Sequence, residues 1–208
     1  MAEYELALTG IGGQGVQLGA QVIARAATRE AREVMFFGIY GGMMRGGPTD
    51  ATVVVADAPI TAPPVVPRAW SAIALHDESW APIERKLRTG ALVLVNDSTF
   101  ASEIHAPATV HRLPASELAT EVGNPMGATL VMLGAYSAIT GLVALDSLVE
   151  GMRDSIPSYR VQHLDANERA LRAGFGAAET GTHPAWSSAG ATSRTSTVNG
   201  TQHEEVGS

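Results

Sequence analysis

The sequence has no cysteine and few aromatic residues. The absence of cysteine from all 208 residues excludes disulfide bonds, thiolate zinc sites, a cysteine nucleophile and cysteine-held iron–sulfur clusters within this chain. Because aromatic residues make up only 5% of a chain that is 45% hydrophobic, its core must consist mainly of small aliphatic side chains. Such a core suits helices packed against a sheet.

Basic residues are also scarce, and long apolar runs are missing. The chain has 14 Lys and Arg against 21 Asp and Glu and no basic stripe, which argues against a nucleic-acid partner. No segment reaches the ~18 uncharged apolar residues that cross a bilayer, so we expect no membrane insertion. The first residues lack the pattern of a signal peptide. Together these features predict a cytoplasmic protein.

Short apolar runs alternate with segments of helical periodicity through most of the chain. Strands are expected at residues 4–10, 34–39, 49–57, 71–76, 91–96 and 109–114, and helices at residues 16–33, 77–90, 114–123, 127–141, 146–156 and 160–175. This alternation predicts an α/β fold, a three-layer, mostly parallel open sheet with helices on both faces and a helical C-terminal part. The prolines of residues 59–70 make that segment a surface connection.

Two segments differ from the rest in polarity. Residues 127–141, GATLVMLGAYSAITG, have too little polarity to face water, which predicts a buried helix or a helix packed against a partner. After about residue 176 the chain is rich in Ser, Thr, Gly and Ala and cannot bury enough apolar area to offset the entropy of ordering. We therefore expect one α/β domain at residues 1–176 and a low-complexity, disordered tail at residues 177–208.

The stretch GIGGQGVQLG, residues 10–19, connects the first expected strand to the first helix. Gly10, Gly12 and Gly15 have the spacing of a dinucleotide-binding fingerprint. Free backbone N–H groups and the helix dipole also make such a loop a general anion site. An NAD site needs in addition an acidic residue at the end of the second strand, whereas that strand ends FGIYGG. The loop therefore has four possible roles: a site for NAD or FAD, a site for another anionic ligand, part of a subunit junction, or a tight turn without a ligand.

A single arginine lies among four glycines in YGGMMRGGPTD, residues 40–50. The glycines let the backbone come close to a ligand, and the planar guanidinium of Arg45 suits a carboxylate or a phosphate. The alternative is a solvated loop arginine.

Weaker candidates are Asn96, Asp97 and Ser98, which could face a ligand or form a strand-to-loop turn, and Asn167, a polar contact on a helix or an exposed residue. Met43, Met44, Met126 and Met132 are expected as core or interface residues rather than ligands. The six histidines have no metal-ligand spacing, so no metal site is expected.

Four segments occur in the order GIGGQGVQLGAQVIARAA, YGGMMRGGPTDATVVVADAPI, NPMGATLVMLGAYSAITGL and NERALRAGF. Together they resemble the gamma subunit, or gamma domain, of the thiamine-diphosphate-dependent 2-oxoacid:acceptor (ferredoxin) oxidoreductase family, over roughly residues 5–176. The resemblance implies an accessory subunit of an enzyme that oxidatively decarboxylates a 2-oxoacid, of the pyruvate, 2-oxoglutarate, 2-oxoisovalerate or aryl type. The resemblance further implies that coenzyme A accepts the acyl group and that an iron–sulfur protein accepts the electrons. The isolated chain is expected to be inactive.

The resemblance also implies a division of cofactors among subunits. Alpha and beta subunits would hold thiamine diphosphate and Mg²⁺, and iron–sulfur clusters would lie in beta or in a ferredoxin-like subunit or acceptor protein. Coenzyme A is expected in the complex, and no cofactor is expected to belong to this chain alone. The absence of cysteine agrees with this division, because the chain cannot hold such clusters itself.

The residues that match the family's glycine elements carry the site expectation. They are Gly12, Gly13, Gln14, Gly15, Arg45, Gly46 and Gly47, expected as cofactor-binding loops on the coenzyme A side or at a subunit interface. No catalytic and no metal-binding residue is expected. The chain departs from the family at Met43, commonly acidic, and at Thr129, commonly asparagine. Two other functions stay open: a stand-alone NAD- or FAD-binding oxidoreductase domain, and a purely structural assembly subunit.

Overall fold

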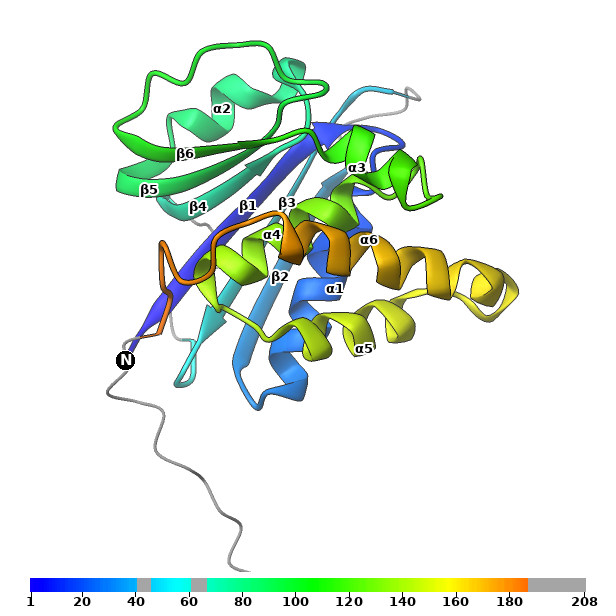
Figure 1. Ribbon diagram of the computed structural model, residues 1–208. Helices are drawn as coiled ribbons and strands as arrows, with labels where there is room; N and C mark the ends of the chain where they lie inside the picture. Colours follow the sequence, from blue (N-terminus) through cyan, green and yellow to red (C-terminus); the bar gives the residue numbers. More distant parts are fainter. Residues whose placement is uncertain (41–45, 61–66, 187–208) are drawn as a thin grey trace, which may run out of the picture.

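The protein folds around one six-stranded mixed sheet (Figure 1). The computed structural model describes residues 1–40, 46–60 and 67–186. The strands are β1 (Glu3–Ile11), β2 (Glu33–Tyr40), β3 (Pro48–Ala56), β4 (Ala69–Ala74), β5 (Leu87–Asn96) and β6 (Ala108–Leu113), in the sheet order β2-β3-β1-β4-β5-β6. β1, β4, β5 and β6 pair in parallel, whereas β3 runs antiparallel to both β1 and β2. Only β3 is therefore reversed, and the expected mostly parallel sheet is confirmed.

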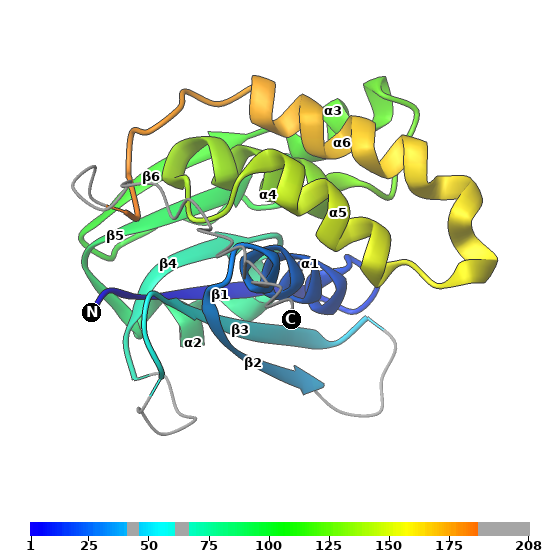
Figure 2. The same ribbon diagram turned by 90° about the horizontal axis from the view of Figure 1, so that it is seen from below.

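Helices cover the two faces of this sheet unequally (Figure 2). One face carries α1 (Val16–Arg29), α3 (Ala115–Glu121), α4 (Ala128–Thr140), α5 (Leu145–Ser155) and α6 (Leu164–Gly176), with the 3-10 helix η2 (Ser158–His163) joining the last two. On the other face, the described residues form η1 (Asp77–Ser79) and α2 (Trp80–Glu84) and no further helix. The expected helices on both faces are thus confirmed. Within the described ranges, each helix is too short or too polar to cross a membrane.

The helix expected at residues 77–90 is much shorter in the structure. It ends at Glu84, and β5 begins at Leu87, so the expectation was wrong for its second half. Pairing with a distant strand decides this, because the Lys86 carbonyl accepts a 2.7 Å hydrogen bond from the Ala69 amide, where β4 begins. Arg88 forms an ion pair with the buried Glu5 instead of ending a helix. Burial raises the pKa of Glu5, and the Arg88 guanidinium opposes that rise.

Helix α4 is buried along its whole length, as its composition predicts. The covering elements belong to the same chain: the sheet on one side and α6 on another. A Cβ atom placed on Gly134 of α4 would overlap the Leu171 carbonyl of α6, so the two backbones are nearly in contact. This helix therefore needs no partner subunit to keep it out of water.

The folded part extends beyond the boundary expected at residue 176. Residues 177–186 pack against the domain, with Ala185 buried and the Trp186 indole donating a 3.0 Å hydrogen bond to the Leu142 carbonyl. The boundary expected at residue 176 therefore lies too early in the chain. Residues 177–186 have few aliphatic side chains, but backbone hydrogen bonds to the end of α4 hold them against the domain. The rest of the expected tail, residues 187–208, lies outside the described residues.

Ala31 has a left-handed backbone conformation, with φ of 56°, just after α1 ends. Side chains with a Cβ atom are strained there, and glycine is the usual residue at this position of a helix end. We expect Ala31→Gly to stabilise the chain by about 0.5–1 kcal/mol in urea unfolding. Ala24→Gly, within α1, is the control and should destabilise by a similar amount. Equal losses in both variants would contradict the prediction.

Candidate functional site

The two glycine segments singled out in the sequence lie against each other. β1 ends at Ile11 opposite Pro48 of β3, so the loops that follow and precede these strands meet. The Gly12 amide donates a 2.9 Å hydrogen bond to the Gly47 carbonyl, and a Cβ atom on Gly12 would lie 3.1 Å from the Gly46 amide nitrogen. Six of the seven expected site residues are thus brought together, while Arg45 lies outside the described residues.

Glycine is required in the first loop by its backbone conformation. Gly13 and Gly15 have φ values of 104° and 81°, a region that other residues rarely adopt. The Gln14 side chain between them accepts a 2.9 Å hydrogen bond from the Ile11 amide and donates one of 3.2 Å to the Leu75 carbonyl. Both ends of this amide are therefore used inside the fold, and Gln14 shapes the loop.

Two helices begin beside this loop without a side-chain cap. The N-caps of α1 and α4 are Gly15 and Gly127, and neither helix has an acidic residue in its first turn. The Thr129 hydroxyl donates to the Gln14 carbonyl and so ties the start of α4 to the loop. Free N–H groups and the positive ends of two helix dipoles consequently lie close together, an arrangement that favours an anion.

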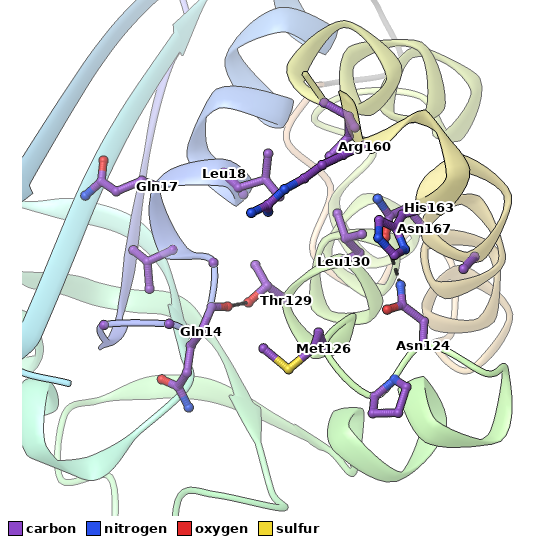
Figure 3. A pocket seen from close by; sticks show the side chains of 18 of the residues that line it. Gln14, Gln17, Leu18, Asn124, Met126, Thr129, Leu130, Arg160, His163 and Asn167 are labelled. Carbon is purple, nitrogen blue, oxygen red and sulfur yellow. Dashed lines mark hydrogen bonds between the residues drawn. The ribbon is translucent and has the colours of Figure 1, made fainter. Parts of the chain in front are cut away.

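A cavity of about 700 Å³ opens between these helix ends and the far wall formed by α6 and η2 (Figure 3). Residues 12–19 form one side, and residues 123–126 with the start of α4 form another. Arg160 and His163 supply the basic groups, and the Arg160 guanidinium extends toward α1 in Figure 3. None of the described lining residues is acidic, although the chain carries a net charge of −7. The cavity therefore suits an anionic ligand.

Two side chains of the loop between α3 and α4 and one of α6 also line the cavity. The Asn124 amide donates a 2.9 Å hydrogen bond to Asn167 of α6, and Met126 lies in the mouth with 81% of its surface exposed. Asn167 was a weaker candidate in the sequence and Met126 was expected in the core or at an interface. Arg160 was not singled out, and His163 was considered only as a metal ligand. The sequence pattern that could have indicated Arg160 and His163 is weak. It consists of two basic residues three positions apart, before a helix, in a chain that is acidic overall. In the described part of the chain, His, Asp and Glu do not gather in a group that could hold a metal ion.

The structure places Asn96 away from ligand contact. The Asn96 side chain accepts a 3.1 Å hydrogen bond from the Ala115 amide and bonds Thr99, so it fastens the start of α3 to β5. The strand order argues against an NAD site. β3 lies between β1 and β2, whereas in the dinucleotide-binding fold the first two strands are neighbours. Asp50 of β3 accepts a 2.6 Å hydrogen bond from the Thr9 hydroxyl and is already engaged.

Comparisons with known proteins agree on one family. The model of the family described as pyruvate ferredoxin/flavodoxin oxidoreductase matches residues 5–177. Pyruvate synthase subunit PorC of Methanothermobacter marburgensis is 33% identical over 175 residues, covering 82% of this chain and 95% of the relative.

Two solved structures share the fold. The gamma subunit of a keto/oxoacid ferredoxin oxidoreductase from Geobacter sulfurreducens has a TM-score of 0.74 at 24% identity, covering 85% of this chain and 96% of its own. The 2-oxoglutarate:ferredoxin oxidoreductase of Magnetococcus marinus, solved with 2-oxoglutarate, coenzyme A and succinyl-CoA bound, has a TM-score of 0.77 at 19% identity. This chain covers 33% of that longer protein, with 89% of its own residues. Because the family match spans most of the sequence, the chain belongs to the pyruvate ferredoxin/flavodoxin oxidoreductase family.

Proposed function

We propose that this chain is the gamma subunit of a multi-subunit 2-oxoacid:acceptor oxidoreductase that carries out coenzyme A-dependent oxidative decarboxylation. The observation that carries this proposal is the acid-free cavity, at which two uncapped helix ends and Arg160 converge, in a chain of this family. Partner subunits would hold thiamine diphosphate, Mg²⁺ and the iron–sulfur clusters, since a chain without cysteine has no thiolate for such clusters.

Coenzyme A fits the chemistry of this cavity. Its phosphates are anionic, which suits the free N–H groups of α1 and the Arg160 guanidinium, and its other parts are partly apolar, which suits Leu130 and Ile156 in the lining. When bound, coenzyme A would supply the thiol that accepts the acyl group. The residues of this chain would hold its phosphates and orient it toward the partner subunit.

Arg45 remains part of the proposal on sequence grounds. It directly precedes Gly46, whose backbone lies against Gly12 at the edge of the lining. We propose that its guanidinium binds an anionic group of the same ligand or of a partner. Arg45→Lys, which keeps the charge and loses the planar fork, distinguishes this role from that of a solvated loop arginine.

The function can be tested by co-expression with the alpha and beta subunits of a related oxidoreductase. We expect a stable complex that reduces a low-potential dye only when both a 2-oxoacid and coenzyme A are added, and no turnover by this chain alone. Tight binding of NAD or FAD by the isolated chain, without assembly, would support the stand-alone oxidoreductase domain instead.

Arg160→Ala tests the ligand side of the proposal. Loss of a charge-assisted hydrogen bond to phosphate should raise the KM for coenzyme A on the order of tenfold, with little change in the KM for the 2-oxoacid. Arg85→Ala, an exposed position at the end of α2 on the other face of the sheet, is the matched control. An unchanged KM for coenzyme A in an intact complex would favour the purely structural subunit.

A further inference from the structure

A buried serine lies behind the glycine loop, on the face of the sheet opposite to the cavity. Ser79 is the last residue of η1 and is only 2% exposed. η1 and α2 lie on one face of the sheet, whereas α1 and α4 pack on the other (Figure 2). Ser79 is not part of the cavity lining. Its hydroxyl nevertheless donates a hydrogen bond to the Gly10 carbonyl, near the end of β1.

The peptide unit between Gly10 and Ile11 is held at both of its polar atoms. Its carbonyl accepts the hydrogen bond from Ser79, and its N–H donates a 2.9 Å hydrogen bond to the Gln14 side chain. Because a peptide unit is planar, these two contacts fix its orientation. The turn that follows depends on this orientation, since the Gln14 amide donates a 3.1 Å hydrogen bond to the Ile11 carbonyl. Residues 12–15 of the turn then line the cavity.

A second buried hydroxyl joins the same set of hydrogen bonds. Thr9 is fully buried, and its hydroxyl donates a 2.6 Å hydrogen bond to the Asp50 carboxylate and lies 3.0 Å from the Ser79 carbonyl. The Asp50 carbonyl in turn accepts a 2.8 Å hydrogen bond from the Gln17 side chain, in the first turn of α1. Polar contacts therefore connect η1 to the end of β1, the start of β3 and the start of α1.

We propose that Ser79 is a positioning residue for the glycine loop. By fixing the peptide unit between Gly10 and Ile11, it holds the loop in the conformation that presents backbone N–H groups to the anionic groups of the ligand. This proposal rests on the proposed function, in which coenzyme A is the ligand. Ser79 acts through the backbone and does not touch the ligand itself. Supporting contacts of this kind matter because small displacements of a binding group weaken its interactions with the ligand.

Ser79→Ala in the co-expressed complex tests this role, because it leaves the buried Gly10 carbonyl without its partner. The KM for coenzyme A should rise roughly three- to tenfold, with little change in kcat. Hydrogen exchange of the Ile11 and Gly12 amides in the full-length chain should become faster, which is a readout independent of turnover.

Ser71→Ala is the matched control. Ser71 is also fully buried, and its hydroxyl lies 3.3 Å from the Glu5 carbonyl, toward the other end of β1. This variant loses the same chemical group beside the same strand, but away from the loop. We expect the KM for coenzyme A and the exchange of the loop amides to stay at their wild-type values.

Two variants of Thr9 repeat the test without changing Ser79, in case Ser79→Ala does not fold. Thr9→Val keeps the shape of the side chain and loses the hydroxyl, whereas Thr9→Ser keeps the hydroxyl. The first should raise the KM for coenzyme A and speed exchange of the loop amides, and the second should stay close to the wild type.

The outcomes separate this proposal from the proposed function. If the wild-type complex turns over without coenzyme A, both are wrong. If the wild type requires coenzyme A and neither Ser79→Ala nor Thr9→Val raises its KM, the positioning role alone is wrong. Faster amide exchange with an unchanged KM would make Ser79 a purely structural residue and would overturn the proposal. An equal rise of the KM in Ser71→Ala would do the same, since the effect would then follow from a general loss of stability.

Discussion

Replacing Gly174 with alanine should destabilise the chain by roughly 3 kcal/mol or more, because overpacking that displaces backbone is at the upper end of such effects. A Cβ atom on Gly174 of α6 would overlap the Val131 carbonyl of α4, and one on Gly134 would overlap the Leu171 carbonyl of α6. The two helices cross at these glycines, and neither backbone carbonyl can move aside without separating them. We expect Gly134→Ala to behave in the same way.

Gly176→Ala is the matched control for this prediction. Gly176 is also in α6, but outside its own stretch of the helix no heavy atom lies within 4 Å of the position that its Cβ would occupy. Alanine there should be neutral or stabilise by up to about 1 kcal/mol, because it favours the helix. The urea midpoints of the three variants, Gly174→Ala, Gly134→Ala and Gly176→Ala, test this prediction. Similar midpoints for Gly174→Ala and Gly176→Ala would show that the α4–α6 contact is looser than the structure indicates.

Truncation after residue 179 should destabilise the chain by roughly 3–5 kcal/mol, in the range observed when a packed tryptophan and several hydrogen bonds are lost. The amides of Gly181, His183 and Ala185 donate hydrogen bonds of 2.8–3.1 Å to the last carbonyls of α4. The Trp186 ring packs edge-on against Tyr4 at 4.8 Å, with the Arg32 guanidinium 3.8 Å from its centre.

Truncation after Trp186 provides the control. It keeps these contacts and removes only residues 187–208, a polar segment that should contribute little to the core. We expect its thermal midpoint to stay within a few degrees of the full chain, whereas truncation after residue 179 should lower the midpoint by ~10 °C or more. Equal midpoints for the two truncations would mean that residues 180–186 do not stabilise the fold.

Local pattern determined much of this protein. The apolar runs predict the central strands, because a strand with both faces covered needs consecutive apolar residues. The edge strand β6, ATVHRL, is exposed on most of its residues and has a weaker pattern. The composition of residues 127–141 predicts the buried helix α4, because a helix with so few polar side chains has no face that suits water. The glycines of residues 10–19 predict a strand–loop–helix turn, and Gly13 and Gly15 indeed have positive φ. The family resemblance over residues 5–176 agrees with the family match over residues 5–177.

Contacts between residues far apart in the sequence decided the rest. The reversed β3 separates β1 from β2, Lys86 leaves the helical pattern to pair with Ala69, and Trp186 holds the C-terminal segment. The cavity likewise joins Gly13 to Arg160, which are unrelated in sequence. Periodicity and turn chemistry report only the preferences of neighbouring residues, whereas strand order and cavity walls depend on which distant surfaces pack best. The sequence by itself therefore determined most of the elements and the family, and only the tertiary structure determined the cavity and the basic side chains that line it.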